Sequence, residues 1–317
     1  MRARRAAPLV RPARLAALLA VLLLLLARAD ARPSPRDFDQ AIDVAGRSRA
    51  FRVHVPPGYG IDPLPLVIVF HGGGGNWQSA ERQTGFTALA DRENFIVVYP
   101  NGSGRLADRL LTWNACNCCG YALDRKIDDV AFLRAMVKSL RANFKIDADR
   151  IYATGISNGG MLCYRLACEL SDVIVGIAPV AGAFNCEVCK PIRPVSVLAI
   201  HGTADQHVLY EGGKPKKRAD RWHPRVDRSV SYAVRFWVAQ DGCRPDPIRT
   251  ENGDVIRDTW PDGRFGSEVA LITIRGGAHS WPGGQRLNAR LDPPYPGLNA
   301  TEEIWRFFAA HPRRPSR

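Results

Sequence analysis

The 317-residue sequence lacks an apolar run as long as the roughly 20 residues that a membrane-spanning helix needs. Its apolar run over residues 15–27 follows five arginines and no acidic residue, a pattern typical of a secretory signal peptide. We predict that the signal covers residues 1–31, with cleavage between Ala29 and Ala31, and that the mature chain is secreted, periplasmic or extracellular. A retained signal anchor is the alternative. No cysteine stands near the cleavage point, so a lipid-anchored protein is not expected.

The sequence also lacks internal repeats and any linker rich in Ser, Thr or Pro. The roughly 286 residues that follow the signal can bury a full core, because chains of this length commonly form one domain. We therefore predict a single domain over residues 32–317.

Acidic residues are scarce relative to basic ones, and the formal net charge is +13. Residues 1–31 contain six Arg and one Asp, so their removal leaves a charge of +8. Seven of the remaining Lys and Arg lie in residues 212–228, which we interpret as a solvated loop. No recognisable nucleic-acid-reading motif accompanies them, so a nucleic-acid partner is not expected.

Cysteine is absent before residue 116 and after residue 243. Between these limits lie eight: Cys116, Cys118, Cys119, Cys163, Cys168, Cys186, Cys189 and Cys243. An even number in a secreted chain predicts that most or all are paired in up to four disulfides, whose connectivity the sequence does not give. Zinc is the alternative, but C-x-C-C is not a usual zinc spacing and oxidising compartments favour disulfides, so no metal is expected.

Short apolar runs rich in β-branched residues alternate with amphipathic helical patterns. The helices are expected near residues 78–90, 128–144, 158–169, 229–240 and 301–310, with Asp128 and Asp129 as caps of the second. The strands are expected at residues 51–55, 66–70, 95–99, 151–154, 173–180, 195–200 and 269–274. This alternation predicts an α/β fold with a doubly wound, mostly parallel sheet and helices on both faces.

Chemically competent residues follow these strands at the points where each strand ends. Ser157 stands in "GISNG" after one strand, Asp205 in "HGTAD" after another, and His279 in "GGAHSWPGG" after the last. Ligands bind at the carboxyl ends of strands in such sheets, so we expect these three side chains to meet.

Ser157, His279 and Asp205 are the parts of a catalytic triad. A serine hydroxyl needs a base to activate it, and a carboxylate fixes the orientation of that base. The chain order Ser, Asp, His is that of α/β-hydrolases, and G-x-S-x-G is the pattern of their sharp strand-to-helix turn. Asp128 and Asp129 are alternative candidates for the acid of the triad, but both precede Ser157 in the chain and a helix cap explains them better.

The oxyanion hole is expected from the backbone N–H groups of Asn158 and of Gly73 in "HGGGG". His71 is interpreted as structural in that loop, His201 as preceding a turn, and His207 and His223 as members of the polar loop. Trp113 and Trp281 are candidates for lining the substrate pocket, with core packing as the alternative.

These segments together resemble the secreted esterases of the polyhydroxybutyrate depolymerase family, which includes feruloyl and acetyl-xylan-type esterases. The matching pieces span about residues 50–284: "PLVIVFHGGGG", "FIVVYPNG", "WNACNCCG", "IDDVAFL", "IYATGISNGGMLCYRLACE", "IAPVAGAF", "RPVSVLAIHGTAD" and "GGAHSWPGG". The resemblance implies an α/β-hydrolase fold, the triad Ser157, Asp205 and His279, no cofactor, and a disulfide-bearing loop at "WNACNCCG".

The resemblance also implies an ester substrate, either a hydroxyalkanoate oligomer or an esterified plant polysaccharide. Extracellular depolymerases of the family usually carry a linker and a substrate-binding domain, which this sequence lacks, so we do not expect action on crystalline polymer. A serine peptidase of the same fold and a non-catalytic hydrolase-like binding module are the alternatives. The sequence leaves the oligomeric state open.

Overall fold

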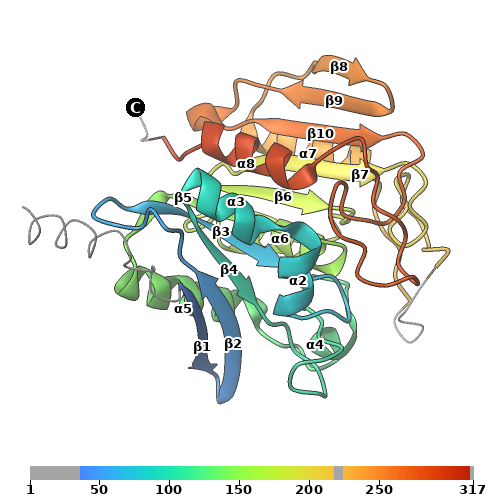
Figure 1. Cartoon of the computed structure of the whole chain (residues 1–317). Helices are drawn as coiled ribbons and strands as arrows, with labels where there is room; N and C mark the ends of the chain where they lie inside the picture. Colours follow the sequence, from blue (N-terminus) through green and yellow to red (C-terminus); the bar gives the residue numbers. More distant parts are fainter. Residues whose placement is uncertain (1–35, 218–223, 315–317) are drawn as a thin grey trace, which may run out of the picture. The chain divides into compact units, whose positions relative to one another are not determined.

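One ten-stranded sheet runs through the residues that the computed structural model describes, which are 36–217 and 224–314 (Figure 1). Its order is β1-β2-β4-β3-β5-β6-β7-β10-β9-β8. The strands are β1 (Asp37–Val44), β2 (Arg47–His54), β3 (Leu64–Phe70), β4 (Ile96–Pro100), β5 (Ile146–Ile156), β6 (Gly176–Val180), β7 (Ser196–Gly202), β8 (Ile248–Asn252), β9 (Val255–Trp260) and β10 (Val269–Ile274).

The six central strands, from β4 to β10 in this order, are parallel, and the strands at both edges are antiparallel. Every residue of β3, β4, β6, β7 and β10 is buried, as expected for parallel strands covered on both faces. The seven strands expected from the sequence are all present.

Three antiparallel edge strands, β1, β8 and β9, were not expected from the sequence. β1 pairs with β2 through a tight turn in which Ala45 (φ 51°) and Gly46 (φ 73°) are both left-handed. β8 is exposed along its whole length and carries polar residues, so its sequence shows no apolar run. These strands are therefore set by pairing with a neighbour and not by burial of their own side chains.

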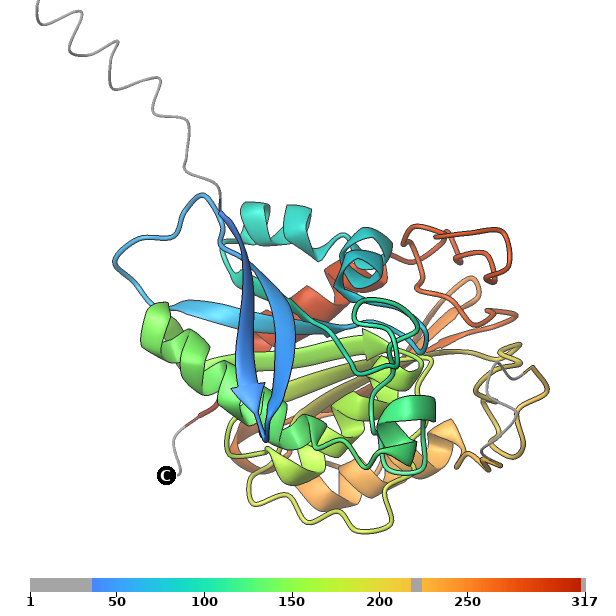
Figure 2. The same ribbon diagram turned by 90° about the horizontal axis from the view of Figure 1, so that it is seen from below.

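Helices cover both faces of the sheet. α5, α6 and α7 pack on one face and α2, α3 and α8 on the other (Figure 2). Their bounds, with those of α4 and of the short 3-10 turn η1, are α2 (Trp77–Thr84), α3 (Phe86–Glu93), α4 (Gly120–Asp124), α5 (Asp129–Asn143), α6 (Asn158–Glu169), α7 (Val230–Asp241), η1 (Arg264–Gly266) and α8 (Ala300–Ala310). The doubly wound arrangement predicted from the sequence is thus confirmed.

Gly85 divides the helix that was expected over residues 78–90 into α2 and α3. Its φ of 69° lies in the left-handed region, where glycine has no steric penalty, and its N–H closes α2 on the carbonyl of Glu81. Asn76 begins α2 as a capping residue, with its side chain accepting from the N–H of Ser79.

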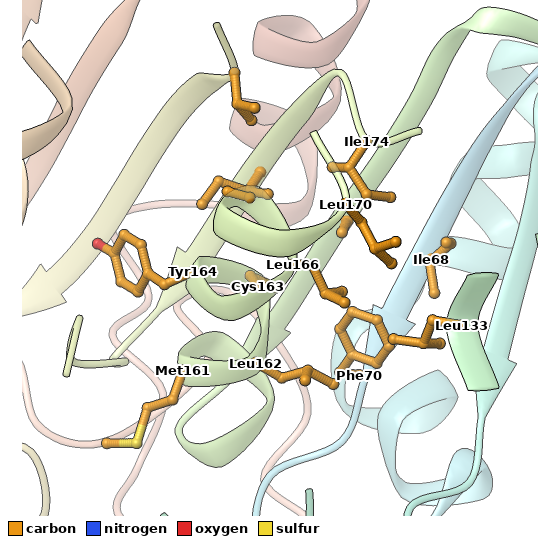
Figure 3. Close-up of a cluster of buried hydrophobic side chains, with 14 of the residues drawn as sticks. Ile68, Phe70, Leu133, Met161, Leu162, Cys163, Tyr164, Leu166, Leu170 and Ile174 are labelled. Atoms are coloured by element: carbon orange, nitrogen blue, oxygen red, sulfur yellow. The ribbon is translucent and has the colours of Figure 1, made fainter. Parts of the chain in front are cut away.

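α6 begins directly after Ser157, and its apolar side chains pack into the core. Leu162 and Leu166 are fully buried among side chains that include Phe70 and Leu133 (Figure 3). Each such leucine stabilises the fold by about 1.5–3 kcal/mol through burial. The start of α6 is therefore held in a fixed position relative to β3 and β5.

Six of the eight cysteines form three disulfides: Cys116–Cys186, Cys118–Cys119 and Cys168–Cys189. The prediction that most are paired agrees with the structure, but full pairing does not. Cys163 is buried in α6 among core side chains, and Cys243 follows α7 with no sulfur partner.

Thiol titration of the denatured, unreduced protein is expected to give two thiols per chain, from Cys163 and Cys243. The titration of the reduced protein, with eight, supplies the reference. Four or more thiols before reduction would contradict the disulfide assignment.

No helix in the described residues is long and apolar enough to cross a membrane. The predicted signal peptide, residues 1–31, and His223 lie outside the described residues, as does part of the basic segment 212–228.

Candidate active site

Ser157 lies at the turn between β5 and α6, with φ 58° and ψ −121°. This conformation is strained for a residue with a side chain, and such strain is concentrated at functional sites. The flanking glycines make the turn possible, because a methyl group on Gly159 would lie 2.6 Å from the carbonyl oxygen of His71 and one on Gly155 would lie 2.8 Å from that of Phe70. The sequence G-x-S-x-G therefore has a steric cause here.

His279 and Asp205 are joined directly, since His279 Nδ1 lies 2.6 Å from Asp205 Oδ2. The loops that carry them meet through a close backbone approach at Gly202 and Gly277. A methyl group on Gly202 would lie 2.1 Å from the carbonyl oxygen of Gly277. Two residues 74 positions apart are thus brought into hydrogen-bond contact, as the sequence predicted.

Asp205 is fully buried and ionised. Burial by itself would raise its pKa, but the hydrogen bonds of His201 and His279 outweigh this effect and hold the pKa well below its usual range. The backbone N–H groups of His207 and Val208 also donate to Asp205 Oδ1, at 2.8 and 2.9 Å. The carboxylate can therefore keep His279 in one orientation.

His207 is a neighbour of the site whose position the sequence did not indicate. Its ring stacks on His279 with centroids 4.8 Å apart. Burial and the proximity of His279 lower the pKa of His207, so its ring stays neutral over a wider pH range. Because it stands two residues after Asp205, the turn that presents the acid also presents this ring.

Ser157 and His279 both remain partly accessible at this edge of the sheet. Among the described residues, no hydrogen bond joins Ser157 Oγ to His279. Catalytic hydrogen bonds are often long without substrate and tighten in the complex.

Gly73 and Asn158 lie side by side next to Ser157. A methyl group on Gly73 would lie 3.7 Å from Cβ of Asn158, and one on Gly72 would lie 3.6 Å from Cβ of Ser157. Within the described chain, neither the N–H of Gly73 nor that of Asn158 has a backbone acceptor. Two free donors thus flank the serine, one of them at the N-terminus of α6, where the helix dipole favours negative charge.

The side chain of Asn158 fixes the loop in front of the serine. Its Oδ1 accepts from the N–H of Trp113 at 2.8 Å, and its Nδ2 donates to the carbonyl of Trp113 at 3.0 Å. Trp113 Nε1 in turn donates to the carbonyl of His71 at 3.0 Å. Asn158 therefore connects the turn at Ser157 with the loop that carries Gly73.

Both tryptophans considered as pocket residues are fully buried. Trp113 packs edge-on against Phe70, and Trp281 packs against Phe86 with its Nε1 donating to Thr301 Oγ1 at 3.0 Å. Because neither indole has an exposed surface, the structure corrects the interpretation of Trp113 and Trp281 as substrate-contacting residues. Core packing, the alternative, describes them.

His71 supports the glycine loop, as interpreted from the sequence. Its Nδ1 donates to the carbonyl of Gly72 at 2.8 Å and its Nε2 accepts from the N–H of Gly102 at 3.0 Å, which requires a neutral ring. Burial lowers the pKa of His71 to about 4.

The free energy of unfolding is expected to fall as the pH drops from about 6.5 to about 4 because of His71. The unfolded chain binds a proton to this ring below pH 6.5, whereas the folded protein resists it until about pH 4. The shift corresponds to a loss of about 3 kcal/mol. Urea unfolding of the wild type and of His71→Asn at several pH values tests this. Equal pH slopes in the two proteins would contradict the role of His71.

Asp128 and Asp129 have different roles, and neither contacts His279. Asp128 caps α5 by accepting from the N–H of Ala131, as predicted. Asp129 does not cap the helix. It forms a buried ion pair with Arg49 at 2.7 Å and accepts from the N–H of Asn114 at 2.8 Å.

Arg225 connects the loop that contains Cys118 with the loop that contains His207. The sequence did not indicate this role. Arg225 donates to the carbonyl of His207 at 2.9 Å and to Cys118 Sγ at 3.2 Å, and it pairs with the buried Asp227 at 2.7 Å. Asp227 also accepts from Asn185 Nδ2 at 2.7 Å. The basic segment is thus partly built into the site, although it was interpreted only as a solvated loop.

No group of three or more metal-ligating side chains occurs in the part of the chain that the structure describes. The site is composed of a serine, a histidine–carboxylate pair and backbone donors.

Residues 49–213 match the model of a protein family described as Esterase PHB depolymerase. The chain belongs to this family. The matched range of this esterase family contains Ser157 and Asp205 and ends before His279.

Several curated relatives of this esterase chain are similar over most of its length. NocK of Nocardia uniformis subsp. tsuyamanensis, an esterase by name, is 34% identical and the match covers 81% of this chain and 76% of NocK. Feruloyl esterase B of Piromyces equi is 32% identical, with 72% of this chain and 42% of that protein covered. Poly(3-hydroxyalkanoate) depolymerase C of Paucimonas lemoignei is 31% identical, with 57% and 44% covered. The chain therefore spans less than half the length of the last two.

Solved structures show the same fold. Acetyl xylan esterase from Aspergillus awamori superposes with a TM-score of 0.57 at 14% identity, covering 86% of this chain and 99% of that one. A protein designated pOPH superposes with a TM-score of 0.56 at 17% identity, covering 90% of each chain. The α/β-hydrolase fold implied by the sequence is confirmed.

Proposed function

We propose that this esterase-family chain is a secreted serine carboxylic-ester hydrolase of the polyhydroxybutyrate-depolymerase type. The observation that carries the proposal is the 2.6 Å contact between His279 Nδ1 and Asp205 Oδ2, at the strand edge where Ser157 occupies a strained turn. Secretion is supported by the N-terminal sequence pattern and by the three disulfides.

In the proposed first step, His279 Nε2 accepts the proton of Ser157 as Oγ attacks the ester carbonyl. Asp205 holds the ring through Nδ1 and stabilises the imidazolium that forms. The tetrahedral oxyanion accepts hydrogen bonds from the N–H groups of Gly73 and Asn158, each of which contributes about 3–4 kcal/mol if the site follows other oxyanion holes. Collapse releases the alcohol, protonated by His279, and leaves an acyl-enzyme.

In the second step, water attacks the acyl-enzyme with His279 again acting as general base. The carboxylic acid leaves and Ser157 regains its proton. Each proton in this sequence moves between groups of the chain, the substrate and water, so the reaction needs no cofactor.

The proposed substrates are short hydroxyacyl esters or feruloyl and acetyl esters. The names of the relatives, a feruloyl esterase and a poly(3-hydroxyalkanoate) depolymerase, support these two classes. Selectivity is then expected to depend on the loops over residues 101–126 and 207–225, because Trp113 of the first contacts Asn158 and His207 of the second stacks on His279.

A fluorophosphonate probe followed by intact-mass analysis tests the nucleophile, with peptide mapping to locate the adduct. We expect one adduct per chain, at Ser157. A comparison of rates on hydroxybutyrate trimer, methyl ferulate, acetylated xylan and triolein then tests the substrate class. The absence of an adduct would favour a binding module, faster cleavage of peptide substrates would favour a peptidase, and a preference for triolein would overturn the short-ester assignment.

A further inference from the structure

A cavity of about 280 Å³ lies at the amino ends of the parallel strands, on the edge of the sheet opposite the catalytic groups. It is formed by the loop before β7, the turn η1 before β10, and the segment after α8. Figure 1 shows η1 and this last segment at the tails of the strand arrows, whereas the catalytic loops follow the arrowheads. β7 has seven residues, so the two sites are about 20 Å apart.

Four arginines line this cavity, namely Arg193, Arg264, Arg313 and Arg314. Arg313 donates to the carbonyl oxygens of Asp172, Ser171 and Ile174, and Arg264 donates to that of Gln240. In the described residues, no ion pair involves Arg193, Arg264 or Arg313. Backbone carbonyls hold the guanidinium groups of Arg264 and Arg313 in place without neutralising their charge.

Most acidic groups near the cavity are already engaged; Asp149, whose charge acts on Arg313, is the exception. Asp172 forms a two-pronged ion pair with Arg134, at 2.5 and 3.0 Å. Glu268 lies 3.7 Å from His311, which is itself part of the lining. Burial raises the pKa of Asp241, behind Arg264, to about 7, so this carboxyl carries little charge below neutral pH. With four arginines in its lining, the cavity still keeps a surplus of positive charge. Burial and the neighbouring Arg193 lower the pKa of Arg313, and they outweigh Asp149 and Asp172, which raise it.

An aromatic ring stands beside these cations. Phe265 has φ 56°, a left-handed conformation that is rare for a bulky residue, and its side chain is half exposed. Pro194 and Pro312 add apolar surface to the same lining. An exposed ring held in a strained turn suits contact with a flat or ring-shaped ligand, because such rings stack on aromatic faces.

We propose that this cavity binds the carboxylate of a small acid that contains one six-membered ring, either a sugar acid or an aromatic acid. Guanidinium groups match the geometry of a carboxylate and can bind it through two parallel hydrogen bonds. The volume is at the lower end of small-molecule sites, which suits one ring and not a long chain. The site is separate from the proposed catalytic reaction and does not depend on it.

The test is isothermal titration calorimetry of the full mature chain with galacturonate, ferulate, galactose, acetate and inorganic phosphate. We expect at least tenfold tighter binding of galacturonate or ferulate than of galactose and acetate, with affinity falling as salt increases. The double variant Arg193→Ala/Arg264→Ala is expected to lose at least tenfold in affinity, and Phe265→Gly about threefold or more. Lys138→Ala/Arg141→Ala, which removes the same two charges from the exposed surface of α5, is the matched control.

The outcomes separate the possible ligands. Binding of galacturonate alone identifies a sugar acid, binding of ferulate alone an aromatic acid, and both support the proposal. Acetate or phosphate binding as tightly as the ring acids would overturn it in favour of a simple anion site. It would also be overturned if the ring acids bind no better than galactose, or if Arg193→Ala/Arg264→Ala binds like Lys138→Ala/Arg141→Ala. Unchanged hydrolysis of p-nitrophenyl acetate in the variants shows that the fold and the distant catalytic edge are intact.

Discussion

Replacing Ser157 by alanine is expected to lower kcat for p-nitrophenyl butyrate by at least about 10⁴-fold. The variant keeps the His279–Asp205 pair and the backbone donors, but it cannot form the acyl-enzyme. Loss of a triad nucleophile in other serine hydrolases costs factors of this size or larger, and what remains comes from the oxyanion hole and binding. The measurement is steady-state hydrolysis by purified wild type and variant at equal concentration.

Ser48→Ala, at an exposed position of β2, is the matched control and should leave kcat unchanged. The melting temperature of Ser157→Ala should not fall, because the substitution removes one oxygen from a strained turn. A Ser157→Ala rate within tenfold of the wild type would mean that the nucleophile is another residue.

Replacing Gly202 by alanine is expected to cost about 3 kcal/mol of stability and to lower kcat about 100-fold. The new methyl group would meet the backbone of Gly277 at 2.1 Å, and backbone cannot rotate away as a side chain can. Overpacking of this kind costs about 1–3 kcal/mol or more. The loops that carry Asp205 and His279 must then separate, and a displacement of about 1 Å can cost 100-fold in rate.

Urea unfolding and kcat measurements on the same preparation test both effects. Gly60→Ala is the control, because the nearest atom to its added methyl group is 3.9 Å away and its backbone is not left-handed. If Gly202→Ala matches Gly60→Ala in stability and kcat, the close approach at Gly202 does not position the histidine–carboxylate pair.

The meeting of Asp205 and His279 at one edge of the sheet could be predicted because its physical cause is local to each strand. A parallel strand that is buried on both faces shows as a continuous apolar run, and Ser157, Asp205 and His279 each follow such a run. The glycines around Ser157 were informative because G-x-S-x-G is a local pattern of a sharp turn, although the backbone that they must clear, at Phe70 and His71, lies far away in the sequence.

Other features depend on contacts that the sequence does not display. Trp113 is buried against Phe70 and Trp281 against Phe86, and both contacts join segments that are far apart in the sequence. The sequence alone therefore could not distinguish a core tryptophan from one that contacts substrate. β1 offered a signal in the Ala45–Gly46 turn, whereas β8 is wholly exposed and is defined only by its pairing with β9. The cysteine pairing required the positions of helix α6 and of the loops, which is why Cys163 could not be recognised as unpaired.

The contacts of Arg225 have a consequence for engineering this esterase toward new esters. Its guanidinium group donates to Cys118 Sγ and to the carbonyl of His207, and so it connects the two loops that are proposed to set selectivity. The disulfide Cys116–Cys186 attaches the same assembly to a third segment of the chain. A single loop transferred from a relative would lack the contacts that Arg225 and the disulfide Cys116–Cys186 make with the other two segments. Libraries that exchange the three segments together should therefore yield more folded, active variants than libraries that exchange one segment at a time.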